Sequence, residues 1–319
     1  MSNVLITGGC GMVGSHLIEF YHSKGIKPIA TFHNPTIDIT EVADKCEYHP
    51  CDVRDRDSVH ALIHNYLPDV IYHLAAQSYP ALSWEIPIET FETNANGTIN
   101  VFESIKKIRE HAPGYDPVVI VACSSAQYGS TLIKHPEPVT EEAEMLPLHP
   151  YGVSKVAQDL LAYQYHTTFG IKCIRARIFN TTGVRKVNDV VSDFTKRAVQ
   201  LEKGLTDKFI CGNLSTKRAI TDVRDLINAL YKLSSDGVYG EAYNISGKHI
   251  YQVKDIISII EEVTGITINA EVDAVLMRPL DEPIIYGNSQ KLIAATGWQQ
   301  EIPLKQTITD MIGYWRTKL

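Results

Sequence analysis

The sequence has no long run of apolar residues. None of its windows holds the roughly 18 consecutive apolar residues that a membrane-spanning helix needs, and the N-terminal MSNVLITGG has no basic segment followed by an apolar one. We therefore expect no membrane span, no contact with a membrane and no secretory signal peptide.

Patterns that bind metals or form disulfides are also missing. The six cysteines form no CxxC pair, and the 12 histidines form no HExxH motif or cluster. We expect no metal site, and reduced thiols in a cytoplasmic protein.

There is no excess of basic residues. The 319 residues include 30 Lys and Arg against 37 Asp and Glu, which gives a formal charge of −7. This balance argues against a surface for nucleic acid or anionic lipid. Hydrophobic residues make up 44% and charged residues 21%, as in an ordinary globular chain with enough apolar material for a large core. The length suggests about two domains.

Short apolar segments alternate with longer amphipathic ones through the first half of the chain. The short segments predict strands at 4–7, 28–31, 47–51, 70–74, 118–122 and 173–178. The longer ones predict helices at 13–23, 58–66, 94–109 and 151–169. Strands that are apolar throughout and separated by helices indicate a parallel sheet covered on both faces. The predicted fold class is α/β, with a doubly wound parallel sheet.

A glycine motif lies between the first expected strand and the first helix. Gly8, Gly11 and Gly14 form GxxGxxG. Glycines at such a turn let the backbone approach a pyrophosphate, which then lies on the helix N-terminus. This predicts a dinucleotide cofactor held by Gly8, Gly11, Met12 and Val13, in a Rossmann-type domain.

The pattern becomes less regular after about residue 180. The segments 222–233 and 243–245 look like a return to the first domain. We predict a dinucleotide-binding domain of residues 1–179 plus about 214–247. A smaller, interleaved substrate domain would then hold residues 180–213 and 248–319.

The end of the second expected strand has no carboxylate. An Asp or Glu there usually binds the ribose of NAD, whereas an Arg suits the extra phosphate of NADP. Residues 31–34 read TFHN and offer neither, so the choice between NAD and NADP stays open. Asp52, with Val53 beside it, follows the third strand and can accept from the adenine amino group. Asp52 can equally be a charge at a helix N-terminus.

Tyr151 and Lys155 are four residues apart on an expected helix and so share one face. A nearby ammonium stabilises a phenolate and lowers the pKa of the tyrosine, which can then exchange a proton with a sugar oxygen. Ser124 follows the fifth strand, where ligands bind in such sheets. It can hydrogen-bond the reacting oxygen, or simply cap the next element.

Together these motifs resemble the extended short-chain dehydrogenase/reductase family of nucleotide-sugar epimerases, dehydratases and reductases. The likeness covers nearly the whole chain and includes CDVRD at 51–55, HLAAQS at 73–78, Asn94 with Gly97-Thr98, CSSAQYG at 123–129 and PYGVSK at 150–155. The resemblance implies Ser124, Tyr151 and Lys155 as the catalytic set, with Asn94 close by. It also implies that Tyr151, Lys155, Leu74, Ala75 and Ala76 line the cofactor, and that Gln77 reaches the sugar.

Motifs in the second half are similar to those of the GDP-mannose branch of that family. They are Arg177–Asn180, Gly212–Leu214, Lys217-Arg218, Thr221–Asp225, Arg278-Pro279 with Glu282-Pro283, and Gly297-Trp298. The resemblance implies a GDP-sugar substrate whose diphosphate is gripped by guanidinium groups, which suit paired phosphate oxygens. The implied substrate residues are Gln77, Ser125, Asn180, Arg197, Arg218, Arg278 and Glu282.

A catalytic carboxylate of the family's dehydratases is absent. These enzymes remove a proton from sugar carbon 5 with a Glu two residues before the Tyr of the YG pair, and here that residue is Ala126. The expected reaction is therefore reduction at carbon 4 of a GDP-4-keto-6-deoxy-hexose. A GDP-sugar 4-epimerase or 4-dehydrogenase is the alternative, followed by a GDP-mannose or heptose 4,6-dehydratase. A non-catalytic dinucleotide sensor is disfavoured by the intact Ser, Tyr and Lys.

The helical segments 94–109 and 151–169 have a second possible role. The resemblance implies a homodimer in which they pair with their copies in a four-helix bundle, and a product used for cell-surface polysaccharide. The sequence alone shows amphipathic helices that can equally cover the sheet.

Overall fold

The centre of the fold is a parallel sheet of seven strands. The computed structural model describes residues 3–134, 137–277 and 281–319. The strands are β1 (Val4–Thr7), β2 (Ile29–Phe32), β3 (Glu47–Pro50), β4 (Val70–His73), β5 (Val118–Ser124), β6 (Cys173–Ile178) and β11 (Ala242–Ile245). Their order is β11-β6-β5-β4-β1-β2-β3, and all neighbours run parallel. This confirms the predicted fold class.

The inner strands are buried on both faces. Val4 and Ile6 of β1 pack into one hydrophobic cluster, and Leu5 between them packs into the other. In β5, Ile120 packs into the same cluster as Val4 and Ile6, and Val121 packs into the cluster of Leu5. Successive side chains of a strand point to opposite faces, so both faces must be apolar when both are covered. This is why these strands read as continuous apolar runs in the sequence.

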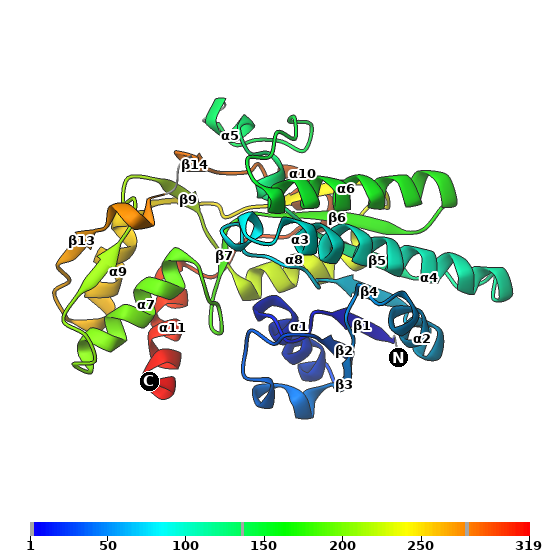
Figure 1. The fold of residues 1–319 in the computed structure, drawn as a ribbon, viewed down its shortest axis with the longest axis horizontal. Coiled ribbons are helices and arrows are strands. Elements are labelled where there is room, and N and C mark those ends of the chain that lie inside the picture. The colour runs from blue at the N-terminus through cyan, green and yellow to red at the C-terminus, as the bar shows by residue number, and fades with distance from the viewer. Residues whose placement is uncertain (1–2, 135–136, 278–280) are drawn as a thin grey trace.

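Helices cover both faces of the sheet (Figure 1). One layer contains α2 (Arg56–Tyr66), α4 (Gly97–His111) and α6 (Pro150–Phe169), and the other contains α1 (Met12–Ser23), α8 (Val223–Asp236) and α10 (Gln290–Thr296). Helix α6 has well-defined ends. The His149 side chain accepts from the Gly152 N–H at its start, and Gly170 ends it with a φ of 63°. Both are ordinary signals for where a helix begins and ends.

A second group of elements lies beside the sheet, at the left of Figure 1. Helices α7 (Val190–Glu202), α9 (Val253–Thr264) and α11 (Leu304–Lys318) enclose a core that includes Ile256, Ile260, Ile308 and Ile312. The adjoining strands are β8 (Phe209–Cys211) with β13 (Ala270–Val272), and β9 (Lys217–Ala219) between β12 (Ile250–Gln252) and β14 (Ile284–Ile285). Between these segments the chain returns to the sheet through α8 and β11. The domain boundaries expected from the sequence stay a prediction.

The remaining elements are short. They are β7 (Thr181–Thr182), β10 (Thr221–Asp222), α3 (Pro87–Phe91), α5 (Thr131–Lys134), the 3-10 turns η1 (Ile39–Glu41), η2 (Ala43–Lys45), η3 (Leu82–Trp84), η5 (Ser125–Gln127) and η6 (Ala274–Leu276), and the π-helical turn η4 (Glu92–Asn96). Within the described ranges, no helix combines the length and the apolar character that crossing a bilayer requires.

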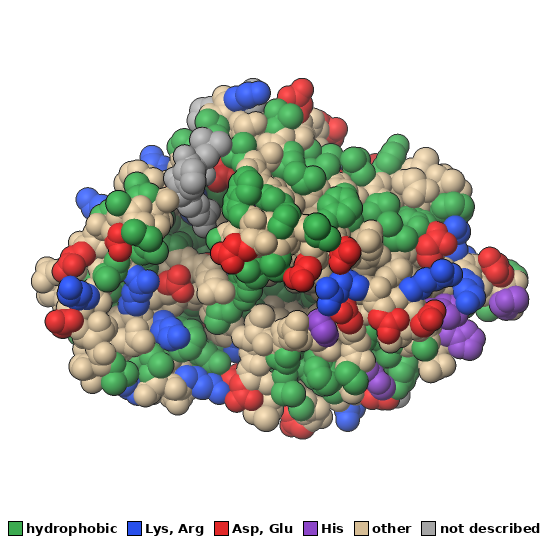
Figure 2. Space-filling model, viewed as in Figure 1, with side chains coloured by type: hydrophobic (Ala, Val, Ile, Leu, Met, Phe, Trp, Pro, Cys, Tyr) green, Lys and Arg blue, Asp and Glu red, His purple; other side chains and the backbone are tan. Residues whose placement is uncertain are grey.

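The sheet has a topological switch point between β1 and β4. After β1 the strands proceed outward through β2 and β3, whereas β4 is followed on its other side by β5 and β6. In open α/β sheets, ligands bind in the crevice outside the carboxyl ends of the strands at such a point. The space-filling view shows a hollow in the surface between the two groups of elements (Figure 2).

Candidate active site

The glycine-rich turn after β1 is closely fitted to its neighbours. Gly8 has a φ of +73°, and a Cβ on it would lie 2.8 Å from the backbone of Ala75. A Cβ on Gly14 would lie 2.3 Å from the Gly8 carbonyl oxygen. Gly11 differs, because a Cβ on it would lie 3.5 Å from the Gly8 carbonyl oxygen, an ordinary contact distance. Two of the glycines therefore allow close packing, and the third leaves open backbone at the start of α1.

The start of α1 can hold an anion. Gly11 is the N-cap residue and provides no side chain to cap the helix. The first N–H groups of a helix need partners from outside, and they favour negative charge. Met12 and Val13 form this first turn. The open approach at Gly11 and the uncapped helix fit a dinucleotide pyrophosphate, as the sequence predicts.

A buried hydrogen bond joins the ends of β1 and β4. Thr7 Oγ1 lies 2.9 Å from His73 Nδ1, and it also accepts from the N–H groups of Leu74 and Ala75 at 3.1 and 3.2 Å. Thr7 therefore fixes the backbone of Leu74 and Ala75 against the glycine turn. This is the position expected of residues that line a cofactor.

The far end of this crevice carries an unexpected basic group. Arg54 forms an ion pair with Asp52 at 2.6 Å, and the same carboxylate also accepts from the Arg54 backbone N–H. His33 lies 3.5 Å from Asp52 on the other side. Arg54 comes from the segment after β3, so a search for Arg at the end of β2 misses it. The contact between Asp52 and adenine stays a prediction, because both its carboxylate oxygens already bind Arg54.

Val53 and Asn100 hold the next stretch in place. Val53 is buried, and a Cβ on Gly97 would lie 2.8 Å from its side chain. The Asn100 amide donates to the Val53 carbonyl oxygen at 2.9 Å. The segment that carries Asp52 is thus anchored on the first turn of α4.

The structure brings the three expected catalytic residues together. Ser124 ends β5, while Tyr151 and Lys155 lie on successive turns of α6. Ser124 and Tyr151 are hydrogen-bonded through their side chains. The Lys155 ammonium lies 5.8 Å from the centre of the Tyr151 ring and donates to the carbonyl oxygen of Ala122 at 2.7 Å.

The loop after β5 packs tightly against the start of α6. Ser124 Oγ accepts from the Ala126 N–H, so its own proton can be donated to Tyr151. A Cβ on Gly152 would lie only 2.7 Å from the Ala126 carbonyl oxygen. Gly152 therefore allows the loop to bring Ser124 within reach of Tyr151. Ser125 is buried in the same loop.

Burial dominates the acidity of the catalytic groups. It raises the pKa of Tyr151 to about 12, although the hydrogen bond with Ser124 opposes the shift. Burial also lowers the pKa of Lys155 to about 8, with Cys123 opposing. The pKa of Tyr151 is therefore raised and not lowered as the sequence predicts, and Lys155 is not among the groups that shift it. At neutral pH Tyr151 keeps its proton and is suited to donate it.

Asn94 fixes the loop after β4. It lies in the π-helical turn η4, a feature that often marks functional sites. Its amide accepts from the Gln77 N–H at 2.9 Å and donates to the Gln77 carbonyl oxygen at 3.0 Å and to Ser154 Oγ at 2.8 Å. Asn94 thus ties this loop to α6 beside Tyr151.

Gln77 also has a structural role. Its side-chain oxygen accepts from the Tyr79 N–H at 2.5 Å, and its nitrogen donates to the Tyr79 carbonyl oxygen at 3.1 Å and to Thr90 Oγ1 at 3.0 Å. Both ends of the amide therefore stabilise the loop, and its contact with the sugar stays a prediction.

The expected nucleotide residues lie around β9. Arg218 is 7% exposed, donates to the Glu282 carbonyl oxygen at 2.8 Å and forms an ion pair with Asp281 at 2.9 Å. This brings Arg218 and Glu282 together. Arg197 is on α7 and has no hydrogen bond or ion pair within the described part of the chain. Arg278 lies outside the described residues.

Asn180 has an unused acceptor. Its side-chain oxygen is buried and has no hydrogen-bond partner among the described residues. Buried polar atoms are normally satisfied, so an orphaned one needs an explanation. A substrate hydroxyl is a suitable donor.

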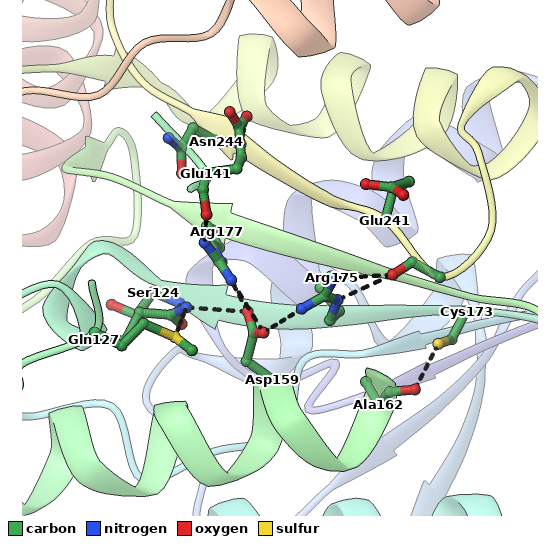
Figure 3. A network of polar contacts seen from close by, with 12 residues as sticks. Ser124, Gln127, Glu141, Asp159, Ala162, Cys173, Arg175, Arg177, Glu241 and Asn244 are labelled. Atoms are coloured by element: carbon green, nitrogen blue, oxygen red, sulfur yellow. Dashed lines mark hydrogen bonds and ion pairs between the residues drawn. The ribbon is translucent and has the colours of Figure 1, made fainter. Parts of the chain in front are cut away.

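A buried ionic network lies beneath the catalytic loop (Figure 3). Asp159 of α6 is fully buried and bonds Arg175 at 2.7 Å and Arg177 at 2.8 Å. Gln127 donates to Asp159 at 3.0 Å, and its side-chain oxygen accepts from the Ser124 N–H at 3.4 Å. The sequence interpretation missed this network. Its signal is two arginines two residues apart on a buried strand, which must point to the same face.

No metal site accompanies these residues. In residues 3–134, 137–277 and 281–319, no group of three or more His, Cys, Asp or Glu side chains is placed to bind a metal ion. The groups available for chemistry are the hydroxyls of Ser124 and Tyr151 and the ammonium of Lys155.

Comparisons with known proteins agree on the family. The profile of the family described as GDP-mannose 4,6 dehydratase matches residues 5–311. The GDP-6-deoxy-D-mannose reductase of Pseudomonas aeruginosa is 27% identical over 318 residues, which cover 99% of this chain and 98% of the relative. GDP-mannose 4,6 dehydratase 2 of Arabidopsis thaliana is 26% identical over 97% of this chain and 85% of the relative.

Solved structures agree on the fold. The structure of RMD from Pseudomonas aeruginosa complexed with NADPH superposes with a TM-score of 0.85 and 25% identity, over 100% of both chains. The UDP-glucose 4-epimerase of Thermotoga maritima with UDP-glucose has a TM-score of 0.90 at 21% identity, over 99% of both chains. This second likeness shows the fold alone. The chain belongs to the GDP-mannose 4,6 dehydratase family, within the extended short-chain dehydrogenase/reductases that its motifs resemble.

Proposed function

We propose that this protein is an NAD(P)-dependent oxidoreductase that reduces carbon 4 of a GDP-4-keto-6-deoxy-hexose. The observation that carries the proposal is the assembled set of Ser124, Tyr151 and Lys155 with Ala126 beside it. Redox chemistry at one carbon needs a proton donor and a polarised carbonyl, which this set supplies. Dehydration also needs a base at carbon 5, and Ala126 cannot provide one. The full-length similarity to a GDP-6-deoxy-D-mannose reductase supports the same choice.

Each catalytic residue has its own role in the reduction. Reduced nicotinamide, when bound, supplies a hydride to carbon 4. Tyr151 donates its proton to the carbonyl oxygen, so that hydride and proton together convert the ketone to an alcohol. Ser124 donates a hydrogen bond to the same oxygen and orients it. Lys155 binds the nicotinamide ribose and stabilises the phenolate that Tyr151 leaves behind. The proton then returns to Tyr151 from solvent.

The cofactor and the substrate take opposite parts of the crevice. We assign the cofactor to the backbone at Gly8, Gly11, Met12 and Val13, to Asp52 and Val53, and to residues 74–76. We assign the GDP-sugar to Gln77, Ser125, Asn180, Arg197, Arg218, Arg278 and Glu282. The orphaned oxygen of Asn180 supports the second assignment, because it faces no donor among the described residues.

A 4-epimerase is the second candidate. The same three residues can oxidise and then reduce one carbon, which is the chemistry an epimerase uses. The fold likeness to a UDP-glucose 4-epimerase permits this candidate, although it shows the fold alone. Such an enzyme retains its cofactor and needs no external reductant.

We also propose that the protein is a homodimer. Val153, Leu160 and Tyr163 are each 47–49% exposed on the outer side of α6. Spacings of seven and three residues place them on one face of the helix. Pairing of α4 and α6 with their copies would cover this apolar face in a four-helix bundle. Elution of the pure protein at monomer mass would remove this proposal.

The setting that we propose is the cytoplasm, with the product used for cell-surface polysaccharide. All six cysteines are free and buried, as is usual where thiols stay reduced.

One experiment tests the function. The protein is incubated with GDP-4-keto-6-deoxy-mannose or with GDP-mannose, with NADH or NADPH, and the products are read by mass spectrometry. A gain of two hydrogens on the keto sugar identifies the reductase and its cofactor. Loss of water from GDP-mannose contradicts it and shows that another group replaces the base missing at Ala126.

A further inference from the structure

A chain of buried hydrogen bonds runs from the catalytic lysine to the glycine-rich turn. Lys155 donates to Gln158 Oε1 at 2.7 Å, and Gln158 Nε2 donates to Thr98 Oγ1 at 2.9 Å. Thr98 Oγ1 lies 3.0 Å from His73 Nε2, and His73 Nδ1 lies 2.9 Å from Thr7 Oγ1. All five side chains are at most 3% exposed. The mechanism above uses only Lys155 of these groups.

The hydroxyl of Thr98 sets the direction of the chain. It donates its single proton to the Asn94 carbonyl oxygen at 2.6 Å. Its oxygen must therefore accept from both Gln158 and His73. Gln158 must present its nitrogen to Thr98, which leaves its oxygen for Lys155. If the Gln158 amide were flipped, its nitrogen would face the Lys155 ammonium, and neither group can accept a hydrogen bond from the other. Its oxygen would face Thr98 Oγ1, whose only proton goes to Asn94.

The histidine fits this direction from the other end, in the tautomer with its proton on Nε2. With Nε2 donating to Thr98, Nδ1 is the acceptor and takes the Thr7 proton. Thr7 Oγ1 is then free to accept from the backbone N–H groups of Leu74 and Ala75, as it does. Burial, with the charge of Lys155 adding to it, lowers the pKa of His73 to about 3, so the ring is neutral. Each link of the chain thus joins one donor to one acceptor, and only Lys155 is charged.

The ammonium of Lys155 has few other partners. Two of its three protons go to uncharged oxygens, the Ala122 carbonyl and Gln158 Oε1, both at 2.7 Å. The titratable groups around it are Tyr151 on α6, Cys123 on β5 and His73 on β4, and behind Cys123 lie Asp159 on α6 and Arg177 on β6. Asp159 already bonds Arg175 and Arg177. No carboxylate among the described residues forms an ion pair with Lys155, so the acceptors that face it decide how well a buried charge is tolerated.

We propose that Gln158 is a positioning residue, which holds the Lys155 ammonium charged and turns its third proton toward Tyr151 and the cofactor ribose. The proposal rests on the proposed function, in which a charged Lys155 supports Tyr151. Gln158 touches neither substrate nor cofactor and acts through Lys155. Thr98 and His73 act one step further back, because they prevent the Gln158 amide from turning over.

The test replaces Gln158 in two opposite ways. Gln158→Leu removes the acceptor and should lower the pKa of Lys155 by about one unit, because the buried charge loses a hydrogen bond. Gln158→Glu keeps the shape and adds a negative charge, which should raise the pKa of Lys155 by about one unit or more. The matched control is Gln164→Leu, the same change at an exposed position of the same helix.

The readout does not depend on turnover. The 13Cε signal of Lys155 is followed against pH by NMR, and it is identified by its loss in Lys155→Met. Opposite shifts in the two Gln158 variants, with none in Gln164→Leu, support the proposal. Equal shifts, or no shift in Gln158→Glu, overturn it. If the leucine variant does not fold, the isosteric glutamate variant still decides, because only a group facing the ammonium can raise the pKa.

Failure of the proposed function can be told apart from failure of the Gln158 proposal. If the titrations shift in opposite directions while the wild-type protein reduces no keto sugar, Gln158 is supported and the reductase is wrong. If the wild type is active, the alkaline limb of kcat/KM should move with the NMR midpoint in each variant. If a Gln158 variant lost kcat tenfold while the alkaline limb of its kcat/KM profile stayed at the wild-type pH, Gln158 would have a merely structural role. That result would overturn the proposal.

Discussion

The catalytic end and the nucleotide end of the site are built from different kinds of secondary-structure element. At the catalytic end, Ser124 closes a seven-residue strand, and Tyr151 and Lys155 lie on a 20-residue helix. At the nucleotide end, Arg218 lies on a three-residue strand whose neighbour β14 has two residues. Buried hydrogen bonds fix the first end from several sides, whereas an ion pair and two carbonyl contacts hold Arg218.

The difference follows what each end must do. Proton and hydride transfer need reacting atoms placed to within a fraction of an ångström, which a buried network on long elements provides. Gripping a diphosphate needs positive charge at about the right place, and short strands suffice for that. Substitutions at the catalytic end should therefore change kcat or folding stability, and substitutions at the nucleotide end should change KM.

The largest effect is expected for Tyr151→Phe, which removes the proton donor and keeps the ring. Loss of a general acid typically costs 10²–10⁴-fold, so kcat should fall about 10³-fold. The KM for the cofactor should stay within about a factor of 2, because the ring and Lys155 remain. Consumption of reduced cofactor with the keto sugar measures the rate. Tyr163→Phe, exposed on the same helix, is the control; normal turnover by Tyr151→Phe would refute the mechanism.

The next effect is on stability, for Asp159→Asn. This change leaves Arg175 and Arg177 buried beside a neutral amide. Breaking a buried ion pair by removing one partner costs about 3–5 kcal/mol, and we expect this loss in the free energy of unfolding. Urea denaturation measures it. Glu262→Gln removes an exposed partner of Lys305 and should cost less than about 1 kcal/mol. Equal losses in the two variants would contradict the role given to the network.

The same carboxylate predicts a pH dependence. Burial alone would raise the pKa of Asp159, but the bonds and charges of Arg177 and Arg175 outweigh it and lower the pKa below its ordinary 3.8. A lowered folded-state pKa contributes stability above the unfolded-state value, and this is lost as pH falls through the folded-state value. The stability gap between wild type and Asp159→Asn should therefore be constant above about pH 5 and shrink below pH 4. If the difference in stability between the two proteins widened as the pH fell, the pKa of Asp159 would be raised in the folded state and not lowered.

Much of the catalytic end could be predicted from the sequence. The parallel sheet follows from short apolar runs, because only strands covered on both faces read that way. Ser124, Tyr151 and Lys155 follow from motif spacing and from the rule that ligands bind at the carboxyl ends of strands. The expected strand 118–122 ends two residues early, since polar Ser124 continues β5 as far as the site.

Other features depend on contacts that spacing does not reveal. The expected helix 94–109 is in fact a π-helical turn followed by α4, and this turn aims the Asn94 amide at the backbone of Gln77. The chain of hydrogen bonds from Lys155 to Thr7 joins four elements, and no local sequence pattern predicts it. The nucleotide end is the least predictable part, because its strands of two or three residues carry almost no periodicity.

The fit of the catalytic loop predicts a smaller effect, for Gly152→Ala. The added Cβ would lie 2.7 Å from the Ala126 carbonyl oxygen, so the loop with Ser124 must move. A misplacement near 1 Å can cost about 10²-fold, and we expect a loss of that order in kcat with little change in cofactor binding. Gly114→Ala, at a glycine with open space around it, is the control. If Gly152→Ala kept full kcat, the loop would not need its close approach to α6.

The smallest effect is expected at the nucleotide end, for Arg218→Ala. Arg218 shares its charge with Asp281, so only part of it is available to a diphosphate. The KM for the GDP-sugar should rise about tenfold, close to 1.4 kcal/mol, while kcat stays within about a factor of 2. Arg316→Ala breaks an exposed ion pair with Glu202 and should leave KM unchanged. Asp281→Asn should act in the opposite direction, because it frees the Arg218 charge for the substrate. A drop in kcat for Arg218→Ala, with KM unchanged, would show that both ends of the site govern the chemistry and would contradict the division of roles between them.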